Sequence, residues 1–230
     1  MPLINVIIPA YNEEKSIQKV IADIPAGLVA DIIVVDNNST DNTFEEAKRA
    51  GATVIKENKQ GYGQACLTGI AFALAKPADQ KPDILVFLDG DYSDHPEEIP
   101  KLLSPILNNQ ADFVIGSRAL GNREPGAMLP QQIFGNWLAT TLLRLFYGAS
   151  FTDLGPFRAI KTDKLVQLKM QDQTYGWTVE MQLKAAKYKL ISTEVPVTYR
   201  KRIGYSKISG TVSGTLKAGY KIILTIFRYL

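Results

Sequence analysis

The chain has 230 residues, a single cysteine and a formal net charge of +3. This length suits one α/β domain with a buried core, and a lone cysteine excludes an internal disulfide. Because the sequence shows neither a signal peptide nor an apolar run long enough to cross a membrane, we expect a cytoplasmic protein.

Strand-like apolar segments alternate with helical patterns along the chain. We expect strands over residues 3–8, 31–36, 53–56, 84–88, 112–117 and 191–197. We expect helices over residues 14–24, from a cap at Ser39 or Asp41 to 50, and over 62–76, 96–107, 130–147, 178–188 and from 212 onward. This order predicts a mostly parallel, doubly wound α/β sheet in a single domain, residues 1–230, with helices on both faces.

Charge is unevenly distributed between the two halves. Residues 1–100 hold 8 Lys or Arg against 16 Asp or Glu, whereas the remaining residues hold 18 against 7. From Arg200 to the C-terminus there is no acidic residue. A basic half is expected to meet an anionic partner, and no nucleic-acid-binding motif accompanies it. The phosphates of a small molecule or of a membrane therefore fit better than a nucleic acid.

The most informative motif is Asp89-Gly90-Asp91, directly after the apolar run of residues 84–88. Ligands of open parallel sheets bind beyond the carboxyl ends of the strands. Two carboxylates one residue apart can reach one Mg²⁺ or Mn²⁺ ion, and Gly90 lets a ligand approach the backbone. Phosphate oxygens commonly fill the open positions of such an ion, so a nucleotide diphosphate is the first candidate. The alternative is a pair of solvated acids that cap the helix starting near Pro96.

Three other loops follow predicted strands. The segment at residues 9–13, Pro-Ala-Tyr-Asn-Glu, has no glycine, and Gly61-x-Gly63 lacks the third glycine of a dinucleotide fingerprint, so a dehydrogenase is not expected. The segment at residues 36–41, Asp-Asn-Asn-Ser-Thr-Asp, can accept hydrogen bonds from a base and a ribose, or cap the next helix, or do both.

The order and spacing of these segments resemble those of the family 2 glycosyltransferases, which have the glycosyltransferase-A fold. The matching segments are residues 7–14, 34–41, 61–65 and 88–91. Residues 116–118, 157–159, Glu180 and 200–207 resemble the branch that contains the dolichyl-phosphate mannosyl- and glucosyltransferases. Asn37-Asn38 departs from the usual Asp-Gly, and residues 120–132 match the branch poorly. The resemblance implies a nucleotide-sugar half, residues 1–118, and an acceptor half, residues 119–230.

The resemblance also implies roles for individual residues. Asp89 and Asp91 would hold Mg²⁺ or Mn²⁺ against the donor diphosphate, with Ser93 at the position of a third ligand. The donor-binding residues would be Pro9, Ala10, Tyr11, Glu13, Asp36, Asn37, Gly61, Gly63, Gly90 and Arg118. Arg118, Arg202 and Lys207 would meet phosphate charge.

Charge develops on the diphosphate as the sugar leaves, so the catalytic set would include the metal-binding pair together with Arg202 and Lys207. These two cations could instead belong to a solvated basic surface, although Gly204 and Gly210, between which Lys207 lies, suit a mobile flap.

Asp153 and Glu180 are the candidate general bases. A hydroxyl acceptor needs a base, whereas a phosphate acceptor is already ionised. Each carboxylate could instead be structural: Asp153 in the turn of residues 152–156, and Glu180 in an ion pair with a nearby arginine.

We therefore expect a metal-dependent, inverting glycosyltransferase that moves a hexose from a donor of the GDP-mannose or UDP-glucose type to a polyprenyl phosphate. The basic and apolar C-terminal helix suits peripheral contact with the inner membrane face, or simply packs on the core. The alternatives are transfer to a soluble or saccharide hydroxyl, a phosphohydrolase with Asp89 as nucleophile, and a non-catalytic module that binds nucleotide sugars.

Overall fold

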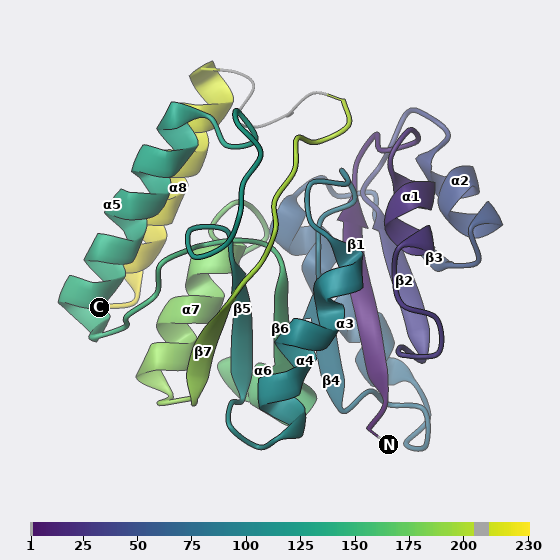
Figure 1. The fold of residues 1–230 in the computed structure, drawn as a ribbon, viewed down its shortest axis with the longest axis horizontal. Helices are drawn as coiled ribbons and strands as arrows, with labels where there is room; N and C mark the ends of the chain where they lie inside the picture. The colour runs from purple at the N-terminus through teal and green to yellow at the C-terminus, as the bar shows by residue number, and fades with distance from the viewer. Residues whose placement is uncertain (1, 205–211) are drawn as a thin grey trace.

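The computed structural model describes residues 2–204 and 212–230. Within this part of the chain, strands form one seven-stranded sheet in the order β3-β2-β1-β4-β6-β5-β7 (Figure 1). All neighbouring strands are parallel except β6, which runs antiparallel to both β4 and β5. The strands are β1 (Ile4–Ala10), β2 (Asp31–Asp36), β3 (Thr53–Lys56), β4 (Ile84–Phe87), β5 (Phe113–Ser117), β6 (Arg158–Lys161) and β7 (Ser192–Pro196).

Helices cover both faces of the sheet, as predicted. They are α1 (Ile17–Ala22), α2 (Thr43–Arg49), α3 (Tyr62–Ala75), α4 (Ile99–Leu107, after a 3₁₀ turn at Pro96–Glu98), α5 (Pro130–Tyr147), α6 (Thr162–Leu168), α7 (Trp177–Lys187) and α8 (Val212–Arg228). Alternating strand residues divide the core into two layers, since successive side chains point to opposite faces. Ile8 and Val86 pack in the layer with α1 and α4, and Ile7 and Phe87 in the layer with α3 and α7.

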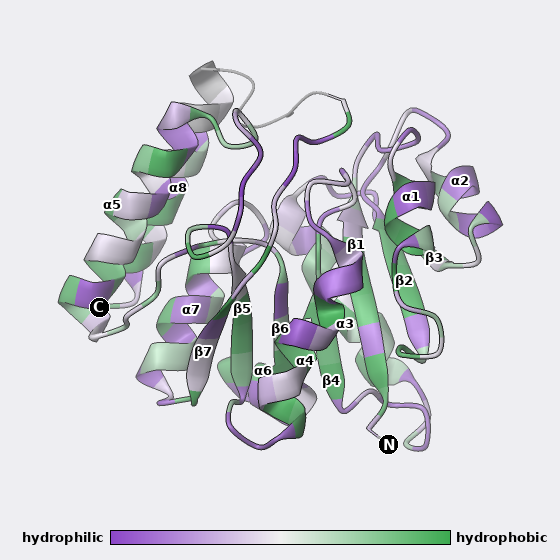
Figure 2. Ribbon diagram, viewed as in Figure 1, coloured by the Kyte–Doolittle hydropathy of each residue, from purple (hydrophilic) through white to green (hydrophobic). Residues whose placement is uncertain are grey.

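α5 and α8 lie side by side at one edge of the molecule, where α8 also contacts α7 (Figure 1). Figure 2 shows hydrophobic residues in the strands of the sheet and in several turns of α5. No helix in the described ranges has the length and apolar character needed to span a bilayer.

The sequence prediction missed β6 and α6. β6 begins with Arg158 and ends with Lys161, so it lacks the apolar run by which the other central strands were found. α1 is also shorter than expected. Neither predicted cap occupies the N-cap position of α2, which is Asn42. The Asp41 carboxylate accepts a hydrogen bond from the Thr43 N–H at 3.0 Å, and the Ser39 hydroxyl accepts from the Asn12 N–H.

Candidate active site

A pocket of about 340 Å³ lies at the carboxyl ends of β1, β2 and β4. This is the edge of the sheet at which a parallel arrangement collects its loops. The predicted residues that line it are Pro9, Ala10, Tyr11, Glu13, Asn37, Gly61, Asp89, Gly90, Asp91 and Arg202. The sequence reasoning missed Gln60, Tyr62, Ala65 and Tyr175. The first three adjoin the recognised glycine segment, whereas no local pattern marks Tyr175.

Asp91 is held in a fixed orientation. It is 3% exposed, and its Oδ1 accepts hydrogen bonds from the Ser93 N–H at 2.9 Å and from the Ser93 hydroxyl at 2.5 Å. Its Oδ2 lies 2.6 Å from Nη2 of Arg202. Oδ1 thus fixes the orientation of the carboxylate, and Oδ2 contacts the guanidinium of Arg202.

Asp89 has a different environment. Its Oδ1 is buried and has no hydrogen-bond partner among the residues that the structure describes. Burial, and next the negative charge of Asp91, raise the pKa of Asp89 to about 7. An unpartnered carboxylate oxygen beside a second carboxylate is an arrangement that a hard cation stabilises. Asp89 and Asp91 therefore fit a Mg²⁺ or Mn²⁺ ion.

Ser93 does not fit the role of a third metal ligand. It is fully buried, it does not line the pocket, and its hydroxyl is donated to Asp91. Asp94, next to it, is 1% exposed, and burial raises the pKa of its carboxyl well above the ordinary value. Within the described residues, no group of three or more acidic, His or Cys side chains is arranged to hold a metal. The protein's share of such a site would be two carboxylates.

Arg202 reaches the pocket from a segment bound to the Asp89–Asp94 loop. The Ile203 N–H donates to the Asp91 carbonyl at 2.9 Å, and the Arg200 N–H to the Ser93 carbonyl at 3.0 Å. Arg202 also lies 3.8 Å from a Glu13 carboxylate oxygen. Lys207, the other predicted phosphate contact on this segment, lies outside the described residues.

Asn37 organises the loop beside the pocket. Its Nδ2 donates to the Lys59 carbonyl at 2.8 Å, and its Oδ1 accepts from the Gly61 N–H at 2.8 Å. Asp36 is 4% exposed, accepts from the Ser39 N–H at 3.2 Å and does not line the pocket. The side-chain amide of Asn37 is therefore engaged in shaping the loop.

The two glycines of the 61–63 segment permit close packing. A Cβ at Gly61 would lie 2.2 Å from the Gln173 carbonyl oxygen, and a Cβ at Gly63 would lie 2.1 Å from that of Asp172. Gly63 is buried and does not line the pocket. Gly63 was predicted to contact the donor, but here it allows the backbone of residues 172–173 to pack against α3.

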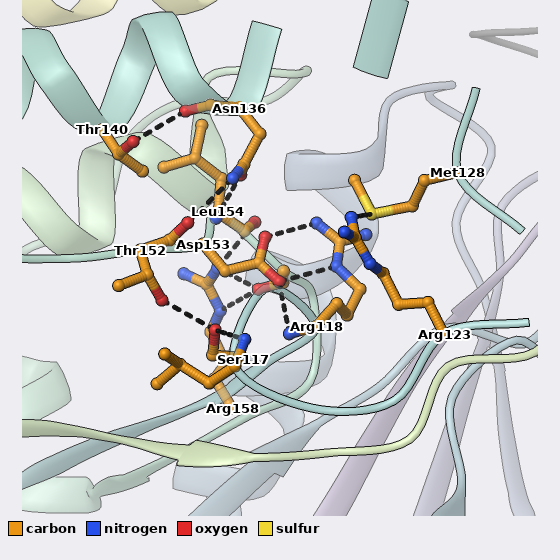
Figure 3. Close-up of polar contacts among 12 residues, drawn as sticks. Ser117, Arg118, Arg123, Met128, Asn136, Thr140, Thr152, Asp153, Leu154 and Arg158 are labelled. Atoms are coloured by element: carbon orange, nitrogen blue, oxygen red, sulfur yellow. Dashed lines mark hydrogen bonds and ion pairs between the residues drawn. The ribbon is translucent and has the colours of Figure 1, made fainter. Parts of the chain in front are cut away.

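Arg118 and Asp153 form a buried ion pair away from the lining of this pocket (Figure 3), and Asp153 lines a second pocket along α5. The Asp153 carboxylate accepts from the Arg118 N–H at 2.7 Å, from Nε at 2.8 Å and from Nη2 at 2.6 Å. Asp153 is 1% exposed. The carboxylate is thus held by the backbone and the guanidinium of Arg118, which favours its structural alternative over a general base and leaves Arg118 bound to it rather than to phosphate.

Glu180 is also buried and fully partnered. Its carboxylate accepts hydrogen bonds from the Gln171 and Asp172 N–H groups and from the Tyr229 hydroxyl, and it pairs with Lys184 at 2.7 Å. It does not line the pocket. The predicted ion pair is present with lysine rather than arginine, and the assignment as a base does not fit this geometry.

Comparison with known proteins gives consistent results. Residues 5–168 match the model of glycosyl transferase family 2. An uncharacterised glycosyltransferase of Mycobacterium tuberculosis is 34% identical over 218 residues, 94% of either chain. The undecaprenyl-phosphate mannosyltransferase of Micrococcus luteus is 30% identical over 224 residues, 90% of this chain and 88% of the relative.

Solved structures share the fold. Glucosyl-3-phosphoglycerate synthase of Mycobacterium tuberculosis, crystallised with Mn²⁺, UDP-glucose and phosphoglyceric acid, superposes with a TM-score of 0.75 at 23% identity. The match covers 99% of this chain and 79% of the synthase. The predicted glycosyltransferase-A fold is thereby confirmed.

Proposed function

This chain belongs to glycosyl transferase family 2, and from that premise we propose that it transfers a hexose from a nucleotide-diphosphate sugar to a polyprenyl phosphate. The observation that carries the proposal is the meeting of Asp89, Asp91 and Arg202 in one pocket at the carboxyl edge of the sheet. Membership of a glycosyltransferase family argues against the phosphohydrolase and the non-catalytic binding module.

The donor would bind with its diphosphate at these three side chains. Asp89 and Asp91 would hold Mg²⁺ or Mn²⁺, which supplies positive charge to the leaving diphosphate when bound. Arg202 adds a fixed cation on the same side, so charge that develops on the diphosphate meets a prearranged positive field. The structural relatives crystallised with Mn²⁺ and UDP-glucose support this assignment.

A second pocket has the chemistry expected for a lipid phosphate. It is about 330 Å³ and runs along one flank of α5. Arg123 and Arg144 supply positive charge to its lining, and Ile133, Trp137 and Phe151 supply apolar surface. The Asp153 carboxylate is also in the lining, where its charge is paired with Arg118. Guanidinium groups suit a phosphate and apolar walls suit an isoprenoid chain. This pocket lies in the acceptor half expected from the sequence.

The outer faces of α5 and α8 support delivery of that lipid from a membrane. Phe134, Trp137 and Leu145 on α5 are 61%, 58% and 72% exposed, and Tyr220 on α8 is 69% exposed. Lys217 and Arg228 are exposed on α8, and neither helix contains an acidic residue. A surface that combines apolar and basic side chains suits an anionic bilayer, which supports the proposal of peripheral contact with the inner membrane face.

The donor test is a thermal-shift panel of UDP, GDP, UDP-glucose and GDP-mannose with and without Mn²⁺. We expect stabilisation by one base only, dependent on Mn²⁺ and lost in Asp91→Ala, because only the native state binds the ligand. The exposed Asp163→Ala is the matched control. Equal stabilisation after chelation would contradict a metal-dependent donor site.

The acceptor test uses the nucleotide sugar found in this panel, labelled in the hexose. Vesicles of anionic phospholipid containing undecaprenyl phosphate should acquire label that partitions into organic solvent. Transfer to phosphoglyceric acid instead would favour the soluble acceptor, for which the fold similarity to glucosyl-3-phosphoglycerate synthase is the supporting observation. A substitution at Arg123 should weaken transfer to the lipid and leave donor binding intact.

A further inference from the structure

One loop connects the C-terminal helix with the donor pocket. Residues 169–176, here named the clasp loop, join α6 to α7. Tyr175 in this loop lines the donor pocket. The carbonyl of Gln173 accepts from the Gln64 N–H at 2.8 Å, and that of Thr174 from the Gly63 N–H at 3.2 Å. The clasp loop therefore supplies partners for the first N–H groups of α3, which a helix end would otherwise leave unsatisfied.

The fit between the clasp loop and α3 is close. Its carbonyl oxygens approach Gly61 and Gly63 so nearly that a Cβ at either position would lie within about 2.2 Å of backbone atoms. A small displacement of the loop would therefore alter both Tyr175 and the amino end of α3, because neither side has free space to absorb it.

Glu180 holds the clasp loop from its opposite side. Its side chain is 0% exposed, and its carboxylate accepts from the Gln171 N–H at 3.0 Å and the Asp172 N–H at 2.7 Å. The same carboxylate accepts from the Tyr229 hydroxyl at 2.7 Å. Tyr229 directly follows α8, so the C-terminal end of the chain is tied to the carboxylate that fixes the loop.

A second tie comes from within α8. Lys221 Nζ lies 2.9 Å from Oδ2 of Asp172, a side chain in the clasp loop. The other oxygen of Asp172 accepts from the Thr174 N–H at 2.8 Å and the Gly176 N–H at 3.2 Å. Asp172 thus joins α8 to the turn that carries Tyr175 (α8 beside α7 in Figure 1).

We propose that Tyr229 and Lys221 of the C-terminal segment are positioning residues for the donor pocket, acting through Glu180, Asp172 and the clasp loop. The inference rests on the proposed function in taking this pocket as the nucleotide-sugar site. It gives Glu180 a role that its buried, fully partnered carboxylate can perform. It also means that a change in the position of α8 should change the affinity of the pocket for the donor.

The test compares Tyr229→Phe, which removes only the hydroxyl, with Tyr188→Phe, a control at an exposed tyrosine after α7. Hydrogen exchange reports the amides of Gln171 and Asp172 in the protein without nucleotide. Calorimetry reports binding of UDP-glucose and GDP-mannose, each with Mn²⁺. Lys221→Met is the second variant, and Lys221→Arg should rescue it because arginine can restore the ion pair.

In Tyr229→Phe and Lys221→Met we expect faster exchange in the clasp loop and at Gly63 and Gln64, with the central strands unchanged. Nucleotide-sugar affinity should fall roughly threefold to tenfold, as expected for one lost hydrogen bond. If these residues served only the stability of the fold, the variants would have a lower urea midpoint, but their folded molecules would bind the nucleotide sugar with wild-type affinity.

Unchanged exchange in the clasp loop of Tyr229→Phe would overturn the inference, and so would faster exchange with wild-type affinity. If wild-type protein binds neither nucleotide sugar, the proposed function fails as well. In that case the exchange result still shows whether α8 holds the loop, so the two failures can be told apart.

Discussion

Arg202 Nη2 lies 2.6 Å from Asp91 Oδ2, so the guanidinium contacts the carboxylate assigned to the metal ion. The two groups come from distant parts of the chain and are brought together by backbone hydrogen bonds between residues 200–203 and the Asp89–Asp94 loop. A metal ion held by Asp91 would, together with this guanidinium, place two positive charges on the same side of the pocket. That is the arrangement a leaving diphosphate requires.

Replacement of Arg202 by Gln should reduce the rate of sugar transfer about 10²-fold, the usual effect of losing one group that stabilises developing charge. Binding of the nucleoside alone should change less, because the guanidinium contacts Asp91 at 2.6 Å and lies farther, at 3.8 Å, from Glu13. Transfer assays and calorimetry with nucleoside and nucleotide measure the two effects. The exposed neighbour Lys201→Gln is the control, and a fully active Arg202→Gln would contradict this role.

The pH dependence of stability should reveal Asp89. Its folded pKa of about 7 exceeds the ordinary aspartate pKa of 3.8, so between these values the folded state binds more protons than the unfolded state. The free energy of unfolding should therefore fall as pH rises through this window. Asp89→Asn should flatten that slope, leaving the part due to the buried Asp94, and should stabilise the chelator-treated protein by up to about 4 kcal/mol at pH 8, with no gain below pH ~4. Urea unfolding at both pH values measures this, and a wild-type slope in the variant would contradict it.

Much of the fold was predictable because its signals are local. The apolar runs at β1, β2 and β4 gave the buried parallel strands, and the acidic loop after β4 was correctly expected to lie at their carboxyl edge. β6 was missed since its antiparallel pairing with β4 and β5 is set by neighbours far away in sequence.

The candidate site was predictable where its residues lie on loops that directly follow strands. Residues on strand-end loops reached the pocket, whereas the environments of Asp153 and Glu180 depend on tertiary contacts. Both lie buried among donors from other segments, which spacing in the sequence does not reveal. Tyr175 enters the pocket for a similar reason, because the clasp loop carries it there.

Removal of only one partner of the Arg118–Asp153 pair should strongly destabilise the fold. Arg118→Met leaves a buried carboxylate without its counter-ion and should cost about 3–5 kcal/mol in the free energy of unfolding. The double variant Arg118→Met/Asp153→Leu should recover part of that loss, because no unpaired charge remains. Urea unfolding of the wild type, Arg118→Met, Asp153→Leu and the double variant measures the coupling.

A different result for Asp153 would change the acceptor assignment. If Asp153→Asn folds and binds the nucleotide sugar normally yet loses all transfer, the carboxylate acts as a base and the acceptor is a hydroxyl. The ion pair with Arg118 leads us to expect reduced stability instead, with transfer per folded molecule largely retained.

Two glycines in helices should respond oppositely to alanine. At Gly63 in α3 a Cβ would lie 2.1 Å from the Asp172 carbonyl oxygen, so Gly63→Ala must displace the clasp loop and should cost more than about 2 kcal/mol. At Gly135 in α5 nothing lies within 4 Å of the added carbon, so Gly135→Ala should stabilise the protein by about 0.5–1 kcal/mol through helix propensity. Urea unfolding gives both signs, and calorimetry should show weaker nucleotide binding in Gly63→Ala alone. Equal nucleotide affinity in the two variants would mean that Tyr175 keeps its place when the loop moves, and that the close packing at Gly63 serves the stability of the fold and not the donor pocket.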